Sequence, residues 1–89
     1  MNVWEIAILK CIDYRGGKTD TQQIYSDMES GDFIALKDHD LRTTKYGGRP
    51  AYKHQVRSHL SNLTQAGDIQ RVSHGVYSIT TRGKKRIQQ

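Results

Sequence analysis

The segment 51–66 carries the side chains best suited to bind a ligand. Its apolar residues recur at helical spacing and predict one face toward a core, formed by Tyr52, Val56, Leu60 and Leu63. The rest of this helix is polar and holds His54, Gln55, Arg57, Ser58, Ser61, Asn62 and Gln65. It contains no acidic residue, whereas a solvated helix usually mixes acids and bases. Arginine can chelate guanine O6 and N7, and glutamine can pair with adenine, so this face suits the edges of base pairs. The alternative is a plain solvated polar face.

Basic residues on either side of this segment extend the predicted contact surface. Tyr46, Arg49 and Lys53, at the start of the helix, are expected to touch backbone phosphates together with the N-terminal amides of the helix. Arg71 and His74 lie in a predicted β-hairpin, and Arg71 suits the negative potential of a minor groove. For His74 a plain turn residue is an equal alternative.

The charge of the chain is divided unevenly along the sequence. Residues 1–41 contain four basic and eight acidic residues, a net of −4, and residues 42–89 contain ten basic residues and Asp68 alone, a net of +9. Together these give the net charge of +5. Such asymmetry indicates a surface for a polyanion, but charge does not choose between DNA, RNA and an acidic membrane. A basic surface kept for solubility is the plain alternative, and the basic tail 82–86 fits it equally well.

The residues typical of catalysis do not form a recognisable pattern. A metal-dependent nuclease needs clustered acids and a lysine, and neither Glu5 nor Glu29 begins a Glu-x-Lys triplet. Adjacent residues on one turn point in different directions, so the Asp-His-Asp run 38–40 is expected to be a solvated turn. His54 and His59 are five residues apart and do not share a helix face, as a zinc-binding pair four apart would. We therefore expect no catalytic site, no metal and no cofactor.

A single cysteine and the lack of a long apolar run indicate the cellular setting. Cys11 lies among apolar residues, cannot form an internal disulfide and is expected to be a buried thiol. No apolar run approaches the roughly 18–20 residues that cross a bilayer. The stretch 3–12 has no basic leader and no cleavage site of a signal peptide. We therefore expect a cytoplasmic protein with no membrane partner.

Capping and turn residues divide the chain into short elements. Asp20 with Gln23 predicts a capping box at the start of a helix, and Gly67 predicts the end of the long one. The expected elements are helices from about residue 3 to the glycines 16–17, over 21–28 and over 51–66, a short strand at 18–19, a helical turn at 38–41, a hairpin at 68–72 and 76–79, and a short helix in the tail 81–89. With no repeat and no linker, residues 1–89 are expected to form a single α+β domain.

The order of the main elements is typical of one arrangement. Three helices followed by a two-stranded hairpin form a winged helix-turn-helix, in which the third helix enters the major groove and the wing lies on the backbone or minor groove. The end of the third helix, Ala66-Gly67-Asp68-Ile69, and the run Gly75-Val76-Tyr77-Ser78-Ile79-Thr80 resemble the N-terminal winged-helix domain of Mrr-type restriction proteins. Looser similarity extends from Trp4 to Arg82, while the stretch 30–50 departs from a minimal winged helix. The nuclease domain of Mrr-type proteins has no room in this chain.

Two functions follow as hypotheses. The first is binding of double-stranded DNA by the helix 51–66 and the wing 69–79, as a transcription regulator or as the DNA-reading module of a restriction or defence system. The second is a winged-helix module that binds another protein without touching DNA. A homodimer or a partner protein is left open, with Trp4, Ile8 and Ile12 as a seam, although core packing is the favoured use of these residues.

Overall fold

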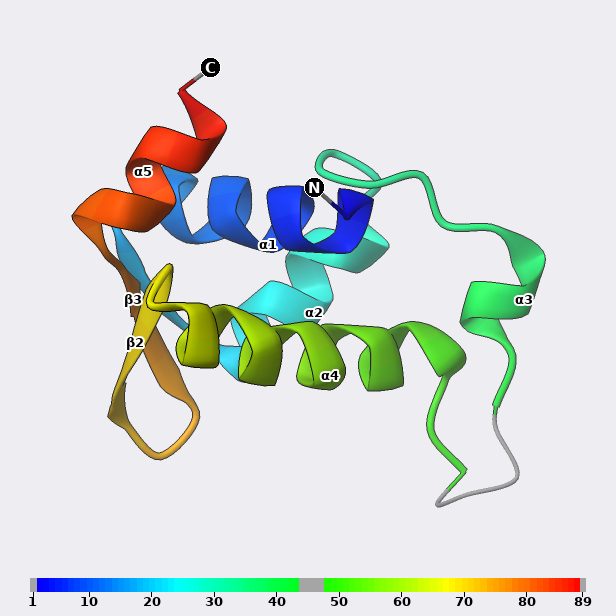
Figure 1. Ribbon diagram of the computed structural model, residues 1–89. Coiled ribbons are helices and arrows are strands. Elements are labelled where there is room, and N and C mark those ends of the chain that lie inside the picture. Colours follow the sequence, from blue (N-terminus) through cyan, green and yellow to red (C-terminus); the bar gives the residue numbers. More distant parts are fainter. Residues whose placement is uncertain (1, 44–47, 89) are drawn as a thin grey trace.

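The computed structural model describes residues 2–43 and 48–88, which form an α+β structure (Figure 1). The elements in chain order are α1 (Val3–Tyr14), β1 (Lys18–Asp20), α2 (Thr21–Glu29), α3 (Asp38–Leu41), α4 (Ala51–Ala66), β2 (Ile69–Ser73), β3 (Val76–Ile79) and α5 (Thr81–Ile87). The expected fold class named three helices and a two-stranded hairpin, and this part of the chain has five helices and a three-stranded antiparallel sheet. The helical turn expected at 38–41 and the short helix expected in the tail are present as α3 and α5, and the strand expected at 18–19 joins the hairpin as β1.

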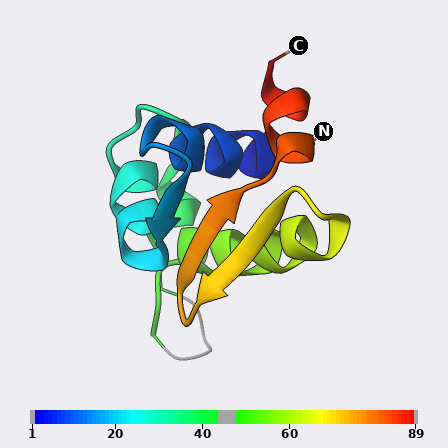
Figure 2. The same cartoon turned by 90° about the vertical axis from the view of Figure 1, so that its left-hand side faces the viewer.

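The sheet places the last strand of the hairpin at its centre. The strand order is β1-β3-β2, so β3 pairs with both neighbours and forms the middle of the sheet (Figure 2). Tyr77 of β3 lies opposite Thr19 of β1 and opposite Arg71 of β2. The register of β2 shifts between Arg71 and Ser73, within the strand and just before the turn at residues 74–75. The three facing residues at this level of the sheet therefore lie on one line across it.

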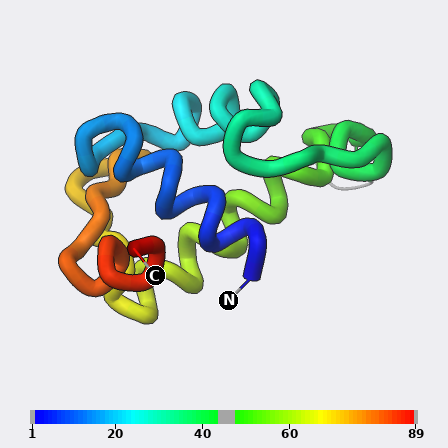
Figure 3. The backbone as a smooth tube through the Cα atoms, turned by 90° about the horizontal axis from the view of Figure 1, so that it is seen from above, coloured from blue at the N-terminus to red at the C-terminus, as the bar shows by residue number. Residues whose placement is uncertain are grey.

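The helices pack on one another beside the sheet. α1 lies above α4 and packs on it, α2 lies to one side of both at an intermediate level, the sheet closes one end, and α3 lies at the far end (Figures 1 and 3). The buried apolar side chains form one cluster, made of Ala7, Ile8, Leu9, Cys11 and Ile12 of α1, Ile24, Tyr25 and Met28 of α2, Tyr52, Val56, Leu60 and Leu63 of α4, and Ile69 of β2. The apolar face predicted for the long helix is thus confirmed. Ile8 and Ile12 have no exposed surface, so they are not available as a dimer seam.

The predicted end of α4 and the predicted start of α2 are both confirmed by their caps. Of the two hydrogen bonds of the capping box predicted at the start of α2, only one is present. Gly67 ends α4 with φ 84°, a left-handed conformation that glycine adopts without strain. At the start of α2, Asp20 accepts a hydrogen bond from the backbone amide of Gln23 at 2.8 Å, as expected. The Gln23 side chain does not complete a capping box, because it donates to Asp27 Oδ1 at 2.9 Å instead.

A buried carboxylate joins α1 to α2. Asp27 is 4% exposed and accepts hydrogen bonds from Arg15 Nε and Nη2, at 3.1 and 2.6 Å, and from Cys11 Sγ at 2.9 Å. The Arg15 hydrogen bonds hold the pKa of the Asp27 carboxyl below its usual range. Burial, with the hydrogen bond to Asp27, raises the pKa of the Cys11 thiol, so this cysteine is the buried, protonated thiol that the sequence predicted.

A second buried carboxylate holds α5. Asp68 is fully buried and forms ion pairs with Arg82 Nε at 3.3 Å and with Arg86. Gly83 is buried against the backbone of Asp68 and the side chain of Ile79, where a Cβ would not fit without a shift. Two of the basic residues of the tail therefore anchor a helix, and do not form a loose charged end.

Candidate nucleic-acid interface

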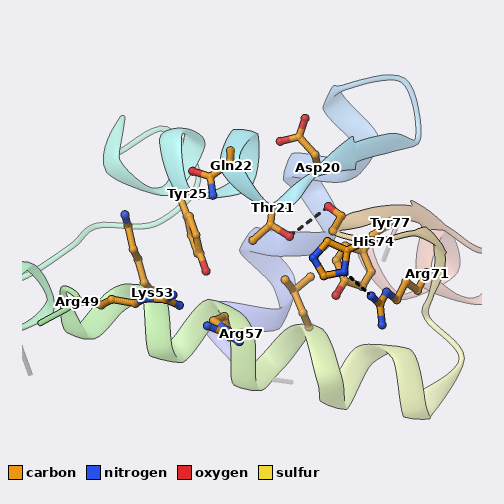
Figure 4. Close-up of a pocket in the computed structure, with 12 residues that line it drawn as sticks. Asp20, Thr21, Gln22, Tyr25, Arg49, Lys53, Arg57, Arg71, His74 and Tyr77 are labelled. Carbon is orange, nitrogen blue, oxygen red and sulfur yellow. Dashed lines mark hydrogen bonds between the residues drawn. The ribbon is translucent and has the colours of Figure 1, made fainter. Parts of the chain in front are cut away.

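An open groove lies between the start of α2, the first half of α4 and the hairpin of β2 and β3 (Figure 4). Its volume is about 940 Å³, and its lining residues are Asp20, Thr21, Gln22 and Tyr25 of the α2 side, Arg49, Lys53, Arg57 and Leu60 of the α4 side, and Arg71, His74, Gly75 and Tyr77 of the hairpin. We call this space the groove. It unites elements that are far apart in the sequence.

The groove is strongly basic. Its lining contains four lysine or arginine side chains, Arg49, Lys53, Arg57 and Arg71. Asp20 is the one carboxylate among the described lining residues. Within the part of the chain that the structure describes, none of these four cations forms an ion pair with a carboxylate. Like charges that converge without partners repel one another, and a bound anion relieves that repulsion.

Contacts near the start and in the middle of α4 fix the helix that carries most of these cations. The Tyr52 ring has no exposed surface, and its hydroxyl donates a hydrogen bond to Glu29 at the end of α2. Burial and this carboxylate raise the pKa of the Tyr52 phenol. In the middle of α4, His59 Nδ1 lies 3.0 Å from Glu5 Oε2 of α1. With Tyr52 and His59 held on α2 and α1, the flank that bears Lys53 and Arg57 is turned to the groove.

The hairpin is fixed on the opposite side by the first residue of α2. The backbone amide and the hydroxyl of Thr21 both donate to the carbonyl oxygen of Gly75, at 2.8 and 3.1 Å. Gly75 has φ 73°, a conformation that favours glycine at this turn. Arg71 Nη2 and His74 Nδ1 are 2.9 Å apart (Figure 4). These hydrogen bonds therefore fix the position of the hairpin tip relative to α2, and Arg71 of the hairpin lines the groove.

Tyr25 forms part of the wall between the two helices. Its ring packs edge-on against Tyr52, with 6.2 Å between the ring centroids. The Lys53 ammonium nitrogen lies 5.0 Å from the centroid of the Tyr25 ring, a cation–π distance. In Figure 4, Tyr25 extends from α2 toward α4, and its hydroxyl end is directed to the space near Arg49 and Arg57.

The groove brings together only some of the residues that the sequence singled out. Arg49, Lys53, Arg57, Arg71 and His74 all line it. The other predicted contacts within α4 are exposed but do not line the groove, namely His54, Gln55, Ser58, Ser61 and Asn62. Tyr46 lies outside the described residues. That any of these side chains contacts DNA stays a prediction.

Helix geometry explains this division. Gln55 and Arg57 are two residues apart, which is about 200° around the helix axis. The two side chains therefore point to nearly opposite flanks of α4 and do not face the same groove. Asn62 shares the flank of Gln55, His54 and Ser58 lie between the two flanks on the outer side of the helix, and Ser61 lies between that side and Arg57.

Sequence reasoning missed the contribution of α2 to this site. Thr21 begins α2, as the predicted helix over 21–28 requires, and Tyr25 is buried, yet each also forms a wall of the groove. Their proximity to the hairpin follows from the pairing of β1 with β3, which the sequence does not reveal. A short strand directly before α2 was the one available signal.

A second, smaller cavity lies at the other end of the molecule. Its volume is about 390 Å³, and it is lined by Val3, Ile6, Phe33, Ile34 and Ala35. Over the described ranges 2–43 and 48–88, the structure has no group of three or more His, Cys, Asp or Glu side chains placed to hold a metal ion. None of the helices in these ranges is long and apolar enough to span a membrane.

The fold and the site thus define a small α+β domain with an open basic groove. Residues 4–89 match the family model of the Mrr N-terminal domain, and the chain belongs to this family, the N-terminal domain of Mrr restriction proteins. The match covers nearly the whole chain and confirms the resemblance seen in its sequence. No curated protein and no solved structure matches the chain. Membership of this family suggests a role in the context of a restriction system.

Proposed function

We propose that this domain is a winged helix that binds double-stranded DNA with the groove. In this proposal α2 and α4 form the helix-turn-helix, α4 enters the major groove, and the hairpin of β2 and β3 is the wing on the backbone. The order α1, β1, α2, α4, β2, β3 supports it, with α3 as an insertion between α2 and α4. So does the location of the groove, which opens where a recognition helix and a wing would meet DNA.

One observation carries the proposal. Four cations from two separate elements, Arg49, Lys53 and Arg57 on the α4 side and Arg71 on the hairpin, converge on the groove without a carboxylate partner among the described residues. Phosphate neutralisation supplies most of the affinity of proteins for DNA, so such a surface is adapted to a duplex backbone.

Three acidic residues of the first half are engaged between helices, while Asp20 lines the groove. Asp27 is paired with Arg15 inside the protein, Glu29 accepts the Tyr52 hydroxyl, and Glu5 contacts His59. These three carboxylates therefore act in packing between helices, and the four groove cations are left to act outward.

The biological role follows as a further part of the proposal. We propose that the domain is the DNA-reading module of a restriction or defence system, with no catalytic site of its own. Its family membership supports this role over that of a transcription regulator. In this role phosphate contacts fix the position of the helix on the duplex, and contacts between α4 and base edges read the sequence.

A duplex binding assay with matched variants tests the proposal. Replacing Lys53 and Arg71 together by alanine removes one cation from each wall of the groove and is expected to weaken binding at 100 mM salt by at least 10-fold. The control replaces Lys84 and Lys85, two exposed lysines of α5 outside the groove, and removes the same charge. Equal losses in the two double variants, or no binding of the unaltered domain to duplex at any salt, would contradict the proposal.

The apolar cavity favours a second candidate function, the binding of a protein. Val3 is 64% exposed, and the cavity that it lines with Ile6, Phe33 and Ile34 gives α1 an apolar site away from the groove. A Phe33→Asp variant separates the two functions. It is expected to leave duplex affinity unchanged under the DNA-binding proposal, and a protein-binding module would lose its partner instead.

A further inference from the structure

We propose that the Tyr25 hydroxyl and Arg57 form a seat in the groove for one backbone phosphate oxyanion, that Lys53 and Arg49 meet the phosphates next to it, and that Arg57 therefore contacts a backbone phosphate and not a guanine. This inference rests on the proposed function and names what one part of the groove binds. It also gives Tyr25, a residue of α2, a direct part in binding.

Tyr25 places a hydroxyl donor inside a basic space. The residue is 7% exposed, yet it lines the groove, so its small accessible part is turned into that space. Its ring is held in one orientation by the edge-on contact with the fully buried Tyr52. No described residue forms a hydrogen bond with the Tyr25 hydroxyl, which leaves this donor for a ligand. An oxyanion accepts such a bond, and bonds to charged acceptors are the stronger ones.

Lys53 lies over the ring of Tyr25, and this contact leaves the N–H donors of its ammonium group available. Its ammonium nitrogen lies 5.0 Å from the centroid of the Tyr25 ring, an attraction that uses no N–H donor of the lysine. Arg57 follows Lys53 by four residues, so the two lie on one flank of α4, separated by about 6 Å along the helix axis. Arg49 precedes the helix and lines the groove beside them. The three cations form a row that can follow consecutive phosphates of one strand.

The flank occupied by Arg57 argues against guanine readout. Lys53 and Arg57 face α2 and the hairpin across the groove (Figure 4). Helical spacing places the exposed His54 and Ser58 on the outer side of α4, opposite its buried face. A helix in the major groove reads base edges with its outer side, and its flanks meet the sugar-phosphate backbones. Arg57, placed among three other basic groups and a hydroxyl, has the surroundings of a phosphate ligand.

Three variants in a duplex anisotropy titration test this seat. Tyr25→Phe keeps the ring, and with it the contacts to Tyr52 and Lys53, and is expected to weaken duplex binding about 10-fold, the loss of one hydrogen bond to a charged acceptor. The slope of log K against log salt should not change, because no charge is removed. Arg57→Ala should reduce that slope by about 0.9, and Arg57→Lys should keep it. Tyr14→Phe, at a tyrosine 72% exposed and outside the groove, is the matched control and should have no effect.

Sequence dependence and free phosphate provide the decisive outcomes. With Arg57→Ala, equal weakening on duplexes that differ at one G·C pair supports the phosphate contact, and weakening limited to duplexes that contain a particular guanine overturns it. Inorganic phosphate that replaces chloride at constant ionic strength should compete with the duplex more strongly in the unaltered domain than in Tyr25→Phe. If inorganic phosphate binds through Tyr25 but duplex does not bind at all, the seat stands and the DNA-binding proposal fails. If duplex binds and Tyr25→Phe matches Tyr14→Phe in affinity, with an unchanged melting temperature, the seat is refuted and the DNA-binding proposal stands.

Discussion

Salt dependence is the property that the groove predicts most directly. A protein that neutralises a phosphate releases condensed counterions, so log K falls against log salt by about 0.9 for each phosphate on B-DNA. Arg49, Lys53, Arg57 and Arg71 are the four lysine and arginine side chains of the groove. If each neutralises one phosphate, the slope is about −3.6. Raising the salt from 50 to 200 mM then weakens binding about 150-fold.

The assay is a series of anisotropy titrations of a labelled duplex at several potassium chloride concentrations. Replacing one groove cation by alanine should change the slope from about −3.6 to about −2.7, whichever of the four is chosen. Lys84→Ala on α5 should leave the slope unchanged, because α5 is held outside the groove by Asp68. A slope close to zero, or the same decrease for Lys84→Ala as for Arg57→Ala, would refute the reasoning.

Three other predictions concern the buried groups that support the site. Asp27→Asn should lower the free energy of unfolding by about 1–3 kcal/mol in urea titrations, toward the low end because Arg15 is 39% exposed in side-chain surface. The pKa of Asp27 is lowered in the folded state, so its contribution to the free energy of unfolding is present above the ordinary pKa of 3.8 and is lost as the pH falls below that value. Asp27→Asn should lack this acid-dependent loss of stability. Gly83→Ala should cost about 1–3 kcal/mol in the same assay, because the added Cβ would overlap the backbone carbonyl oxygen of Asp68 and would lie 2.9 Å from Cγ1 of Ile79. Cys11 should react with a thiol reagent far more slowly in the native protein than in urea, because burial raises the pKa of its thiol.

Each of these three has a distinct contrary result. An Asp27→Asn protein as stable as the unaltered one, with the same loss of stability in acid, would show that the carboxylate does not join α1 to α2. Lys84→Ala is the neighbouring control for Gly83→Ala and should change stability by no more than about 0.5 kcal/mol. Similar losses for both would argue against close packing of α5. Rapid stoichiometric labelling of Cys11 in the native state would contradict its burial.

The sequence predicted the individual helices and strands better than it predicted how they pair and pack. The apolar spacing of Tyr52, Val56, Leu60 and Leu63 predicts α4, and the glycines at 67 and 75 predict its end and the turn of the hairpin, because these signals act over a few residues. The pairing of β1 with β3 joins residues more than fifty positions apart, and no local pattern encodes it. The groove depends on that pairing, so its α2 wall could not be predicted.

Long-range pairing also limited the prediction of site residues. Helical spacing correctly predicted that Gln55, Arg57 and Asn62 are exposed, but it did not indicate which flank of α4 faces the hairpin. That flank is decided by the contacts of Tyr52 with Glu29 and of His59 with Glu5. The basic tail was ambiguous for a similar reason, since Arg82 and Arg86 find their buried partner only when the chain folds.

The most direct test of the central claim is an NMR titration of the ¹⁵N-labelled domain with a short duplex. Amide shifts should be largest at Thr21, Lys53, Arg57, Arg71 and Gly75, which surround the groove on all three of its sides. They should be small at Val3, Ile6 and Phe33 of the apolar cavity and at Lys84 of α5. Shifts confined to the apolar cavity or to α5, with the groove amides unchanged, would contradict binding of DNA by the groove.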